Sequence, residues 1–405
     1  VTALKDDART AGQHRRLVGW RHALLVGQVA MSFVALMTAA LLLRSVQQSY
    51  VIDPGFERRH MGIMMMSPGQ AGYDRPRAEQ LYRDIRVRVE ALPGVTSMSW
   101  ATNLPLFTGP SRSVLVEGRE TAKHPDGIQT VVNTVDLDYF TTAGVAILSG
   151  RDFTDADRSG NLVVAIVNDT MARKYWPNRD PIGQRFSFAG DSTVREVVGI
   201  ARTANYDNLG EAPQPCVYLP LAQNFADAVV LYVRTAGDPA QTLTAVQREV
   251  RQIEPQIDVS DVRTASKVID QALFGSTMGV GLLGVFGLVA LGLASLGMYG
   301  VMTHGVSLRR REIGVRMALG ASGGVIQRMV VRQGMTLVGI GLAIGGVASV
   351  AVGVGLSRVL YGVSAVDPLG FIGATAVLMA VAALACYLPA RRASRLDPLT
   401  TLRTT

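Results

Sequence analysis

Four long apolar runs dominate the pattern of hydrophobic and polar positions along this 405-residue chain. They cover residues 22–43, 271–308, 333–357 and 368–390, and none contains Asp, Glu, Lys or Arg. A helix needs about 20 apolar residues to cross the hydrocarbon core of a membrane, whereas a soluble helix of that length would carry a polar face. The pattern therefore predicts four transmembrane helices in a lipid bilayer.

The segment between the first two runs is polar and predicts a large α+β domain. Two similar β-α-β units lie near its ends, and Asp74 and Asp238 stand where they would cap the two helices. The predicted strands are 61–67 and 95–100 in the first unit and 229–234 and 257–262 in the second. Such a pair predicts a ferredoxin-like layer. Between the units, about 101–227, the β-rich stretches 114–118, 128–135, 162–167 and 194–200 predict an inserted subdomain.

The second apolar run is longer than a membrane requires. Its 38 residues would make roughly 57 Å of helix, against about 30 Å of hydrocarbon. The first helix can likewise continue beyond Arg44 until Pro54 ends it. Both helices are therefore expected to project from the membrane as a stalk.

The formal net charge of +8 is concentrated beside the apolar runs, as membrane orientation signals are, which disfavours nucleic-acid binding. Basic residues precede the first run, separate the second from the third and follow the fourth: Lys5, Arg9, Arg15, Arg16, Arg21; Arg309, Arg310, Arg311, Arg316, Arg328, Arg332; Arg391, Arg392, Arg395, Arg403. An even number of crossings separates these clusters, so all three can be cytoplasmic. Both termini are then predicted inside, and residues 45–271 outside.

Two glycine-rich motifs suggest cofactor binding or catalysis but are better explained by helix structure. Gly279, Gly281 and Gly284 match GxGxxG within an apolar helix and not after a strand, so helix packing is predicted. Ser322 lies in a GxSxG pattern that lacks the preceding strand of a nucleophile elbow. We interpret Gly320 as a helix C-cap and Ser322 as the next N-cap.

No other pattern provides a reaction or an energy source. Asp155 with Asp157, or Asp136 with Asp138, could form a metal site, but paired acids in a loop more often face solvent. The chain has no GxxxxGK[ST] motif, and its apolar runs hold no Asp, Glu, Lys or Arg for ion coupling. Its two cysteines lie in different predicted regions, so no disulfide is expected. We predict a non-enzyme with no catalytic residue, cofactor or metal, whose energy comes from a partner.

Residues 307–321 strongly resemble the cytoplasmic signature of FtsX/MacB-type permeases of ABC transporters. Residues 389–399 resemble the closing motif of that family. Motifs in the polar segment, at 139–144, 150–153, 167–168, 180–183, 197–199 and 217–220, resemble the MacB-like periplasmic core. The resemblance implies a short coupling helix that docks on an ATPase, through Arg309, Arg310, Arg311, Glu312, Ile313, Gly314, Arg316, Met317, Gly320 and Ala321.

The resemblance extends to a predicted organisation of the chain. It implies a cytoplasmic segment (1–21), helix 1 with stalk (22–53), an extracytoplasmic domain (54–264), stalk with helix 2 (265–308), a coupling region (309–332), helices 3 and 4 (333–357, 368–390) and a cytoplasmic tail (391–405), with an FtsX-like permease domain over 271–400. The first residues also resemble the middle of duplicated permeases of acidobacterial type. We therefore expect one half, the C-terminal half, of such a permease.

Two functions follow from this resemblance. The first is a permease subunit of an exporter in the bacterial inner membrane, in which a cytosolic ABC ATPase drives motion of the extracytoplasmic domain. A second permease half, as homodimer or pseudo-dimer, and a periplasmic adaptor are the further partners it implies. The alternative is a regulator of a periplasmic partner such as a cell-wall hydrolase, with nothing exported. Ile313 and Met317 form an apolar side of the coupling helix. We expect this side to enter a groove on the ATPase.

Overall fold

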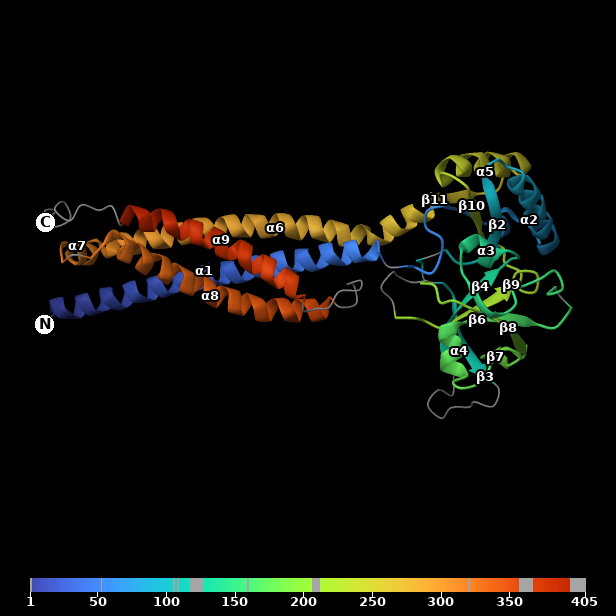
Figure 1. The fold of residues 1–405 in the computed structure, drawn as a ribbon, viewed down its shortest axis with the longest axis horizontal. Coiled ribbons are helices and arrows are strands. Elements are labelled where there is room, and N and C mark those ends of the chain that lie inside the picture. Colours follow the sequence, from blue (N-terminus) through green and yellow to red (C-terminus); the bar gives the residue numbers. More distant parts are fainter. Residues whose placement is uncertain are drawn as a thin grey trace. The chain divides into compact units, whose positions relative to one another are not determined.

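The computed structural model describes residues 2–51, 53–104, 106–107, 109–116, 127–158, 160–205, 212–319, 321–356 and 367–393. The chain divides into two compact units (Figure 1). We call Val1–Tyr50 together with Gly275–Thr405 the bundle unit, and Val51–Phe274 the α+β unit.

The bundle unit consists of long apolar helices. They are α1 (Thr2–Ser49), α6 (Ala265–Leu308, whose first turns belong to the α+β unit), α8 (Gly323–Gly355) and α9 (Pro368–Ala393), with the short α7 (Arg310–Ala318) between α6 and α8. All four long helices are long and apolar enough to cross a membrane, which confirms the predicted spans. As expected, α1 continues beyond Arg44, and it ends at Ser49, before Pro54.

Glycines on α8 allow a close approach to α1. A Cβ atom added to Gly341 would lie 2.7 Å from Cγ1 of Val29, and one added to Gly345 would lie 2.9 Å from the carbonyl oxygen of Ala30. Helices in lipid associate through such small residues. The GxGxxG motif lies inside α6, as predicted. There, a Cβ on Gly279 would approach Leu42, whereas one on Gly281 would meet nothing within 4 Å.

The α+β unit contains the predicted ferredoxin-like layer. Its elements are β1 (Met61–Met66), the 3-10 turn η1 (Pro68–Ala71), α2 (Arg75–Glu90), β2 (Val95–Ala101), β10 (Val229–Thr235), α5 (Pro239–Ile253) and β11 (Val259–Thr264). The strands follow the order β11-β1-β10-β2 and pair antiparallel. Asp74 and Asp238 cap α2 and α5 as predicted, accepting hydrogen bonds from Arg77 N at 3.1 Å and Ala240 N at 3.0 Å.

A second set of strands lies between β2 and β10 in the chain. Its elements are β3 (Ser111–Val116), β4 (Ile128–Val135), α3 (Tyr139–Ala143), β5 (Ile147–Gly150), β6 (Val164–Asn168), α4 (Asp169–Tyr175), β7 (Arg185–Phe188), β8 (Arg195–Ala201) and β9 (Cys216–Pro220). Six of these strands pair in the order β4-β3-β7-β8-β6-β9, and β9 pairs again with β4. The six strands therefore close on themselves. The pair Ala101 and Val135 joins this ring to β2.

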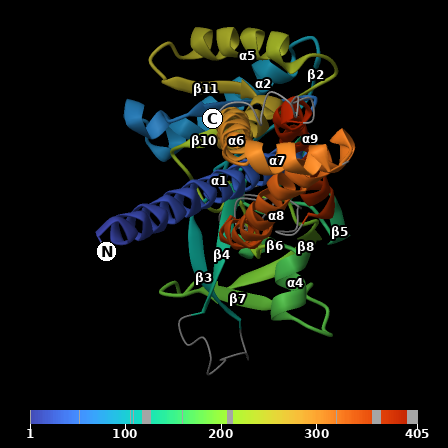
Figure 2. The ribbon, with the colours of Figure 1, turned by 90° about the vertical axis from the view of Figure 1, so that its left-hand side faces the viewer.

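Each set of strands has its own hydrophobic core. In the first, α2 and α5 cover one face of the four strands (Figure 2) and bury Trp100, Ile85 and Val246. In the second, Phe186 and Phe188 are buried beside α4. The two cores therefore belong to two layers of one sheet. The first layer consists of β11, β1, β10 and β2, and the second consists of the strands from β3 to β9.

Candidate functional site

The segment after α6 forms the helix that the sequence predicted as the coupling element. Arg309 precedes α7, and α8 begins at Gly323. Ser322 is the N-cap residue of α8, as predicted, and its carbonyl oxygen accepts a hydrogen bond from Val325 N at 3.0 Å. Its hydroxyl makes no cap hydrogen bond within the described part of the chain. Gly320 lies outside the described residues.

The apolar side of α7 packs inside the chain. Ile313 is only 1% exposed and contacts Ile326 of α8, while Val306 and Met317 pack around this pair. In this structure Ile313 is therefore not free to enter a groove on a partner as expected, whereas Met317 is only partly buried. Instead, the two residues fix α7 against the ends of α6 and α8. Ala321 belongs to the same cluster.

The opposite side of α7 is exposed and carries both apolar and charged groups. Leu319 is 83% exposed and Val315 is 44% exposed. Glu312 and Arg316 form an ion pair of 2.6 Å one turn apart, so Arg316 already has a carboxylate partner within the helix. Arg310 is exposed as well.

The remaining predicted coupling residues lie in different environments where the structure describes them. Gly314 is buried, and Arg309 donates a hydrogen bond to Gln333 Oε1 at 3.3 Å. The side chain of Arg311 lies outside the described residues. Val315 and Leu319 were not singled out from the sequence, although their spacing of four residues places them on one side of a helix.

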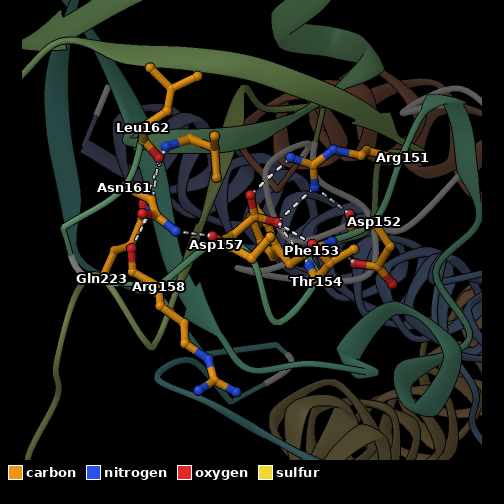
Figure 3. A network of polar contacts seen from close by, with 11 residues as sticks. Arg151, Asp152, Phe153, Thr154, Asp157, Arg158, Asn161, Leu162 and Gln223 are labelled. Carbon is orange, nitrogen blue, oxygen red and sulfur yellow. Dashed lines mark hydrogen bonds and ion pairs between the residues drawn. The ribbon is translucent and has the colours of Figure 1, made fainter.

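One of the predicted acidic residues in the α+β unit, Asp157, lies in an environment that differs from the prediction (Figure 3). Asp157 was expected to face solvent but is 5% exposed. Arg151 Nη1 and Nη2 donate to its two carboxylate oxygens at 2.7 and 2.8 Å, and Thr154 N donates to Oδ2 at 2.8 Å. The hydrogen bonds from Arg151 hold the pKa of Asp157 below its usual value. This carboxylate orders a loop.

The other predicted acids serve similar structural roles. Asp155 is exposed, as expected, and pairs with Arg158 at 2.5 Å. Asp136 and Asp138 both pair with Arg86 of α2, at 2.7 and 3.5 Å. Within the described ranges, no group of three or more His, Cys, Asp or Glu side chains could hold a metal ion.

A cleft of about 460 Å³ lies in the α+β unit between α2 and the loop that Asp157 orders. Charges of both signs line it, among them Arg83, Arg86 and Asp136, and Phe153 and Phe225 add aromatic surface. Because the charges largely compensate one another, the lining indicates no particular ligand.

A further polar contact in the bundle unit was not predicted. Arg44 of α1 forms an ion pair with Asp367, which is buried. Asp367 also caps α9, because its Oδ2 accepts a hydrogen bond from Gly370 N at 3.0 Å. In the sequence, Arg44 directly follows the first apolar run and Asp367 directly precedes the fourth. Nothing in the sequence indicated that these two ends lie together.

Comparison with known families decides the identity of this architecture. A model of the MacB-like periplasmic core domain matches residues 27–253, and a model of the FtsX-like permease C-terminal domain matches residues 284–398. The chain belongs to the FtsX/MacB-like permeases of ABC transporters. The resemblance inferred from the sequence motifs is thereby confirmed.

Individual relatives agree with the family. The chain is 26% identical, over 99% of its length, to the macrolide export ATP-binding/permease protein MacB of Azoarcus sp., and it spans 60% of that protein. It is also 26% identical to the uncharacterized ABC transporter permease YvrN of Bacillus subtilis, over 74% of this chain and 76% of the relative. Among solved structures, the periplasmic region of MacB from Actinobacillus actinomycetemcomitans can be superposed on this chain with a TM-score of 0.36 and 12% sequence identity. The alignment covers 52% of this chain and 91% of the solved structure.

The two family models together cover the features described above. The FtsX-like match includes α7 and every predicted coupling residue, whereas the MacB-like match includes the Arg151–Asp157 pair. Permeases of this family are the membrane components of ABC transporters. With its four apolar helices, the chain is a multi-pass protein of the inner membrane.

Proposed function

We propose that this permease couples ATP hydrolysis by a separate cytosolic ATPase to motion of the α+β unit, which lies outside the cytoplasm, in an export process. The exposed surface of α7 is the observation that carries the proposal. Leu319 is 83% exposed and Val315 is 44% exposed, so the outer side of α7 offers an adjacent apolar pair to a partner. The coupling surface is thus Val315 and Leu319, with the Glu312–Arg316 pair at its edge.

The packing of α7 suits force transmission. Ile313 is locked against Ile326 and Val306, which belong to α8 and α6. A displacement of α7 by the ATPase would therefore move the ends of both helices together. Closely packed interiors transmit such displacements because they have low compressibility.

The length of α6 provides a path for that displacement. Its 44 residues make roughly 66 Å of uninterrupted helix, about twice the hydrocarbon thickness. Within the α+β unit, the first turns of α6 are anchored by the buried Val268 and Ile269 and by a hydrogen bond from Ser266 Oγ to Arg58 O at 3.0 Å. We propose that rotation or tilt of α6 moves this anchor. A second permease half would complete the transport unit.

The test is ATP hydrolysis by candidate cytosolic ABC ATPases, with and without the full chain in nanodiscs. We expect stimulation by one candidate and its loss in Leu319→Asp, because a carboxylate would be buried in the contact. Val87→Asp is the matched control, since Val87 is similarly exposed but lies on α2. Equal stimulation by Leu319→Asp and the unmodified chain would refute the assigned surface. If no candidate is stimulated, the coupling role fails and the regulator becomes the better account.

A further inference from the structure

A cavity of about 220 Å³ opens among α1, α6, α7 and α8. Arg21, His22, His304 and Arg309 contribute its basic wall, and Met302 and Val330 contribute to its apolar wall. At about 30 Å³ for each water molecule, this volume corresponds to roughly seven waters. The cavity therefore has room for a phosphate-sized group and part of an alkyl chain.

The cavity lies where three apolar runs end. Arg21 and His22 stand at the start of the first run, Arg309 directly follows the second, and Gln333 opens the third. Met302 lies about two turns inside the second run. The basic groups thus mark the polar boundary of the membrane, and the apolar wall continues toward the hydrocarbon.

Among the described residues, no acidic side chain compensates the charge of the cavity. Within the described part of the chain, neither Arg21 nor Arg309 forms an ion pair. The guanidinium of Arg309 is oriented by its hydrogen bond to Gln333 Oε1. Arginine is well suited to phosphate, which its planar group can bind through two hydrogen bonds.

We propose that this cavity binds an anionic phospholipid from the leaflet that adjoins α7. The phosphate would contact Arg21 and Arg309, and an acyl chain would lie against Met302 and Val330. Basic pockets at the ends of transmembrane helices bind anionic headgroups in this manner. Because Ile313 of α7 also lines the cavity, a bound lipid would contact the α7 cluster. The inference requires only membrane insertion and does not depend on the proposed coupling to an ATPase.

Trp20 provides a local probe of this site. It directly precedes Arg21 and is exposed, whereas Trp100 and Trp176, the other two tryptophans, are buried in the α+β unit. Lipids with brominated acyl chains quench a nearby tryptophan. Trp20 fluorescence of the full chain is measured in mixed bilayers of phosphatidylglycerol and phosphatidylcholine. In one series only phosphatidylglycerol is brominated, and in the other only phosphatidylcholine is brominated. The ratio of the quenching in the two series gives the relative affinity of the site for the two lipids.

We expect a preference of roughly tenfold for phosphatidylglycerol. The double variant Arg21→Gln with Arg309→Gln should reduce the preference to about one, whereas Arg21→Lys with Arg309→Lys should keep most of it and exclude a folding defect. Arg328→Gln with Arg332→Gln is the control, because both residues are exposed, lie on α8 and do not line the cavity.

Three outcomes would overturn the proposal. The first is an unmodified chain that does not distinguish the two lipids. The second is an equal loss of preference in the control pair, which would indicate a general effect of surface charge. The third is displacement of brominated phosphatidylglycerol by millimolar inorganic phosphate, which would show that the cavity takes the free ion and not a lipid.

Discussion

The core of the α+β unit buries large aromatic side chains, whereas in the bundle unit glycines of α8 lie directly against α1. Trp100, Tyr218 and Tyr232 are fully buried, but Gly341 and Gly345 lie against α1. Water drives large apolar surfaces together in the first unit. Lipid provides no such drive between helices, so close backbone approach takes its place.

The polar contacts of the two units differ in the same sense. In the α+β unit, ion pairs such as Arg151–Asp157 order loops beside the cores. In the bundle, the pair Arg44–Asp367 lies at the ends of α1 and α9 and not within the apolar runs. Desolvation of charge is costly in hydrocarbon. We therefore expect the α+β unit to be most sensitive to the truncation of large side chains and to the loss of ion pairs beside its cores. We expect the bundle unit to be most sensitive to side chains that are enlarged at its glycines.

The largest effect should come from removal of bulk in the α+β unit. Trp100→Ala should lower the free energy of unfolding by about 3–5 kcal/mol, because it leaves a cavity in a closely packed core. Trp100→Phe should cost less, since Nε1 of Trp100 has no hydrogen-bond partner among the described residues. Chemical denaturation of the full chain, followed by circular dichroism, measures both. Val87→Ala, at an exposed site, should change stability by no more than about 0.5 kcal/mol; an equal loss there would contradict the comparison.

The next effect should come from added bulk in the bundle. Gly345→Ala should destabilise the bundle by about 1–3 kcal/mol, because the new Cβ would meet backbone atoms of Ala30 that cannot move aside. Gly339→Ala adds the same atom where nothing lies within 4 Å, and it should be neutral or slightly stabilising. The midpoint of thermal unfolding in detergent compares the pair. Equal midpoints for the two variants would show that glycine does not set the α1–α8 spacing.

The smallest effect concerns charge and depends on pH. Arg151→Gln should cost about 1–2 kcal/mol at pH 7, because it removes two hydrogen bonds to a buried carboxylate. The folded-state pKa of Asp157 lies below its unfolded value, so the stabilisation is present above about pH 4 and is lost as the pH falls through the folded pKa. The difference between variant and unmodified chain should therefore shrink below about pH 4. Arg158→Gln, which removes an exposed pair, should have little effect at any pH.

The sequence was sufficient wherever a structure depends on residues close together in the chain. The apolar runs predicted α1, α6, α8 and α9 because hydrocarbon imposes one pattern and one length. Asp74 and Asp238 marked the starts of α2 and α5 because a cap acts on the next few residues. The two β-α-β units then required the ferredoxin-like layer.

The sequence was insufficient where distant segments meet. The closure of β9 on β4 joins strands that are separated by several elements, and no local pattern encodes it. Likewise, Ile313 is buried because α6 and α8 pack beside α7, and the sequence of α7 alone does not show which apolar side its neighbours cover. Asp157 looked exposed because its spacing from Arg151 in a loop does not reveal a bidentate pair.

We propose that ATP-driven displacement of α7 reaches the α+β unit through α6. Hydrogen exchange of the chain with its ATPase in nanodiscs, compared between ATP and ADP, tests this most directly. We predict that exchange in the first turns of α6 and in β1 and β11 changes with the nucleotide, and that Leu319→Asp abolishes the change. If the chain stimulates ATP hydrolysis while exchange throughout the α+β unit is identical in both nucleotides, the transmission account is contradicted.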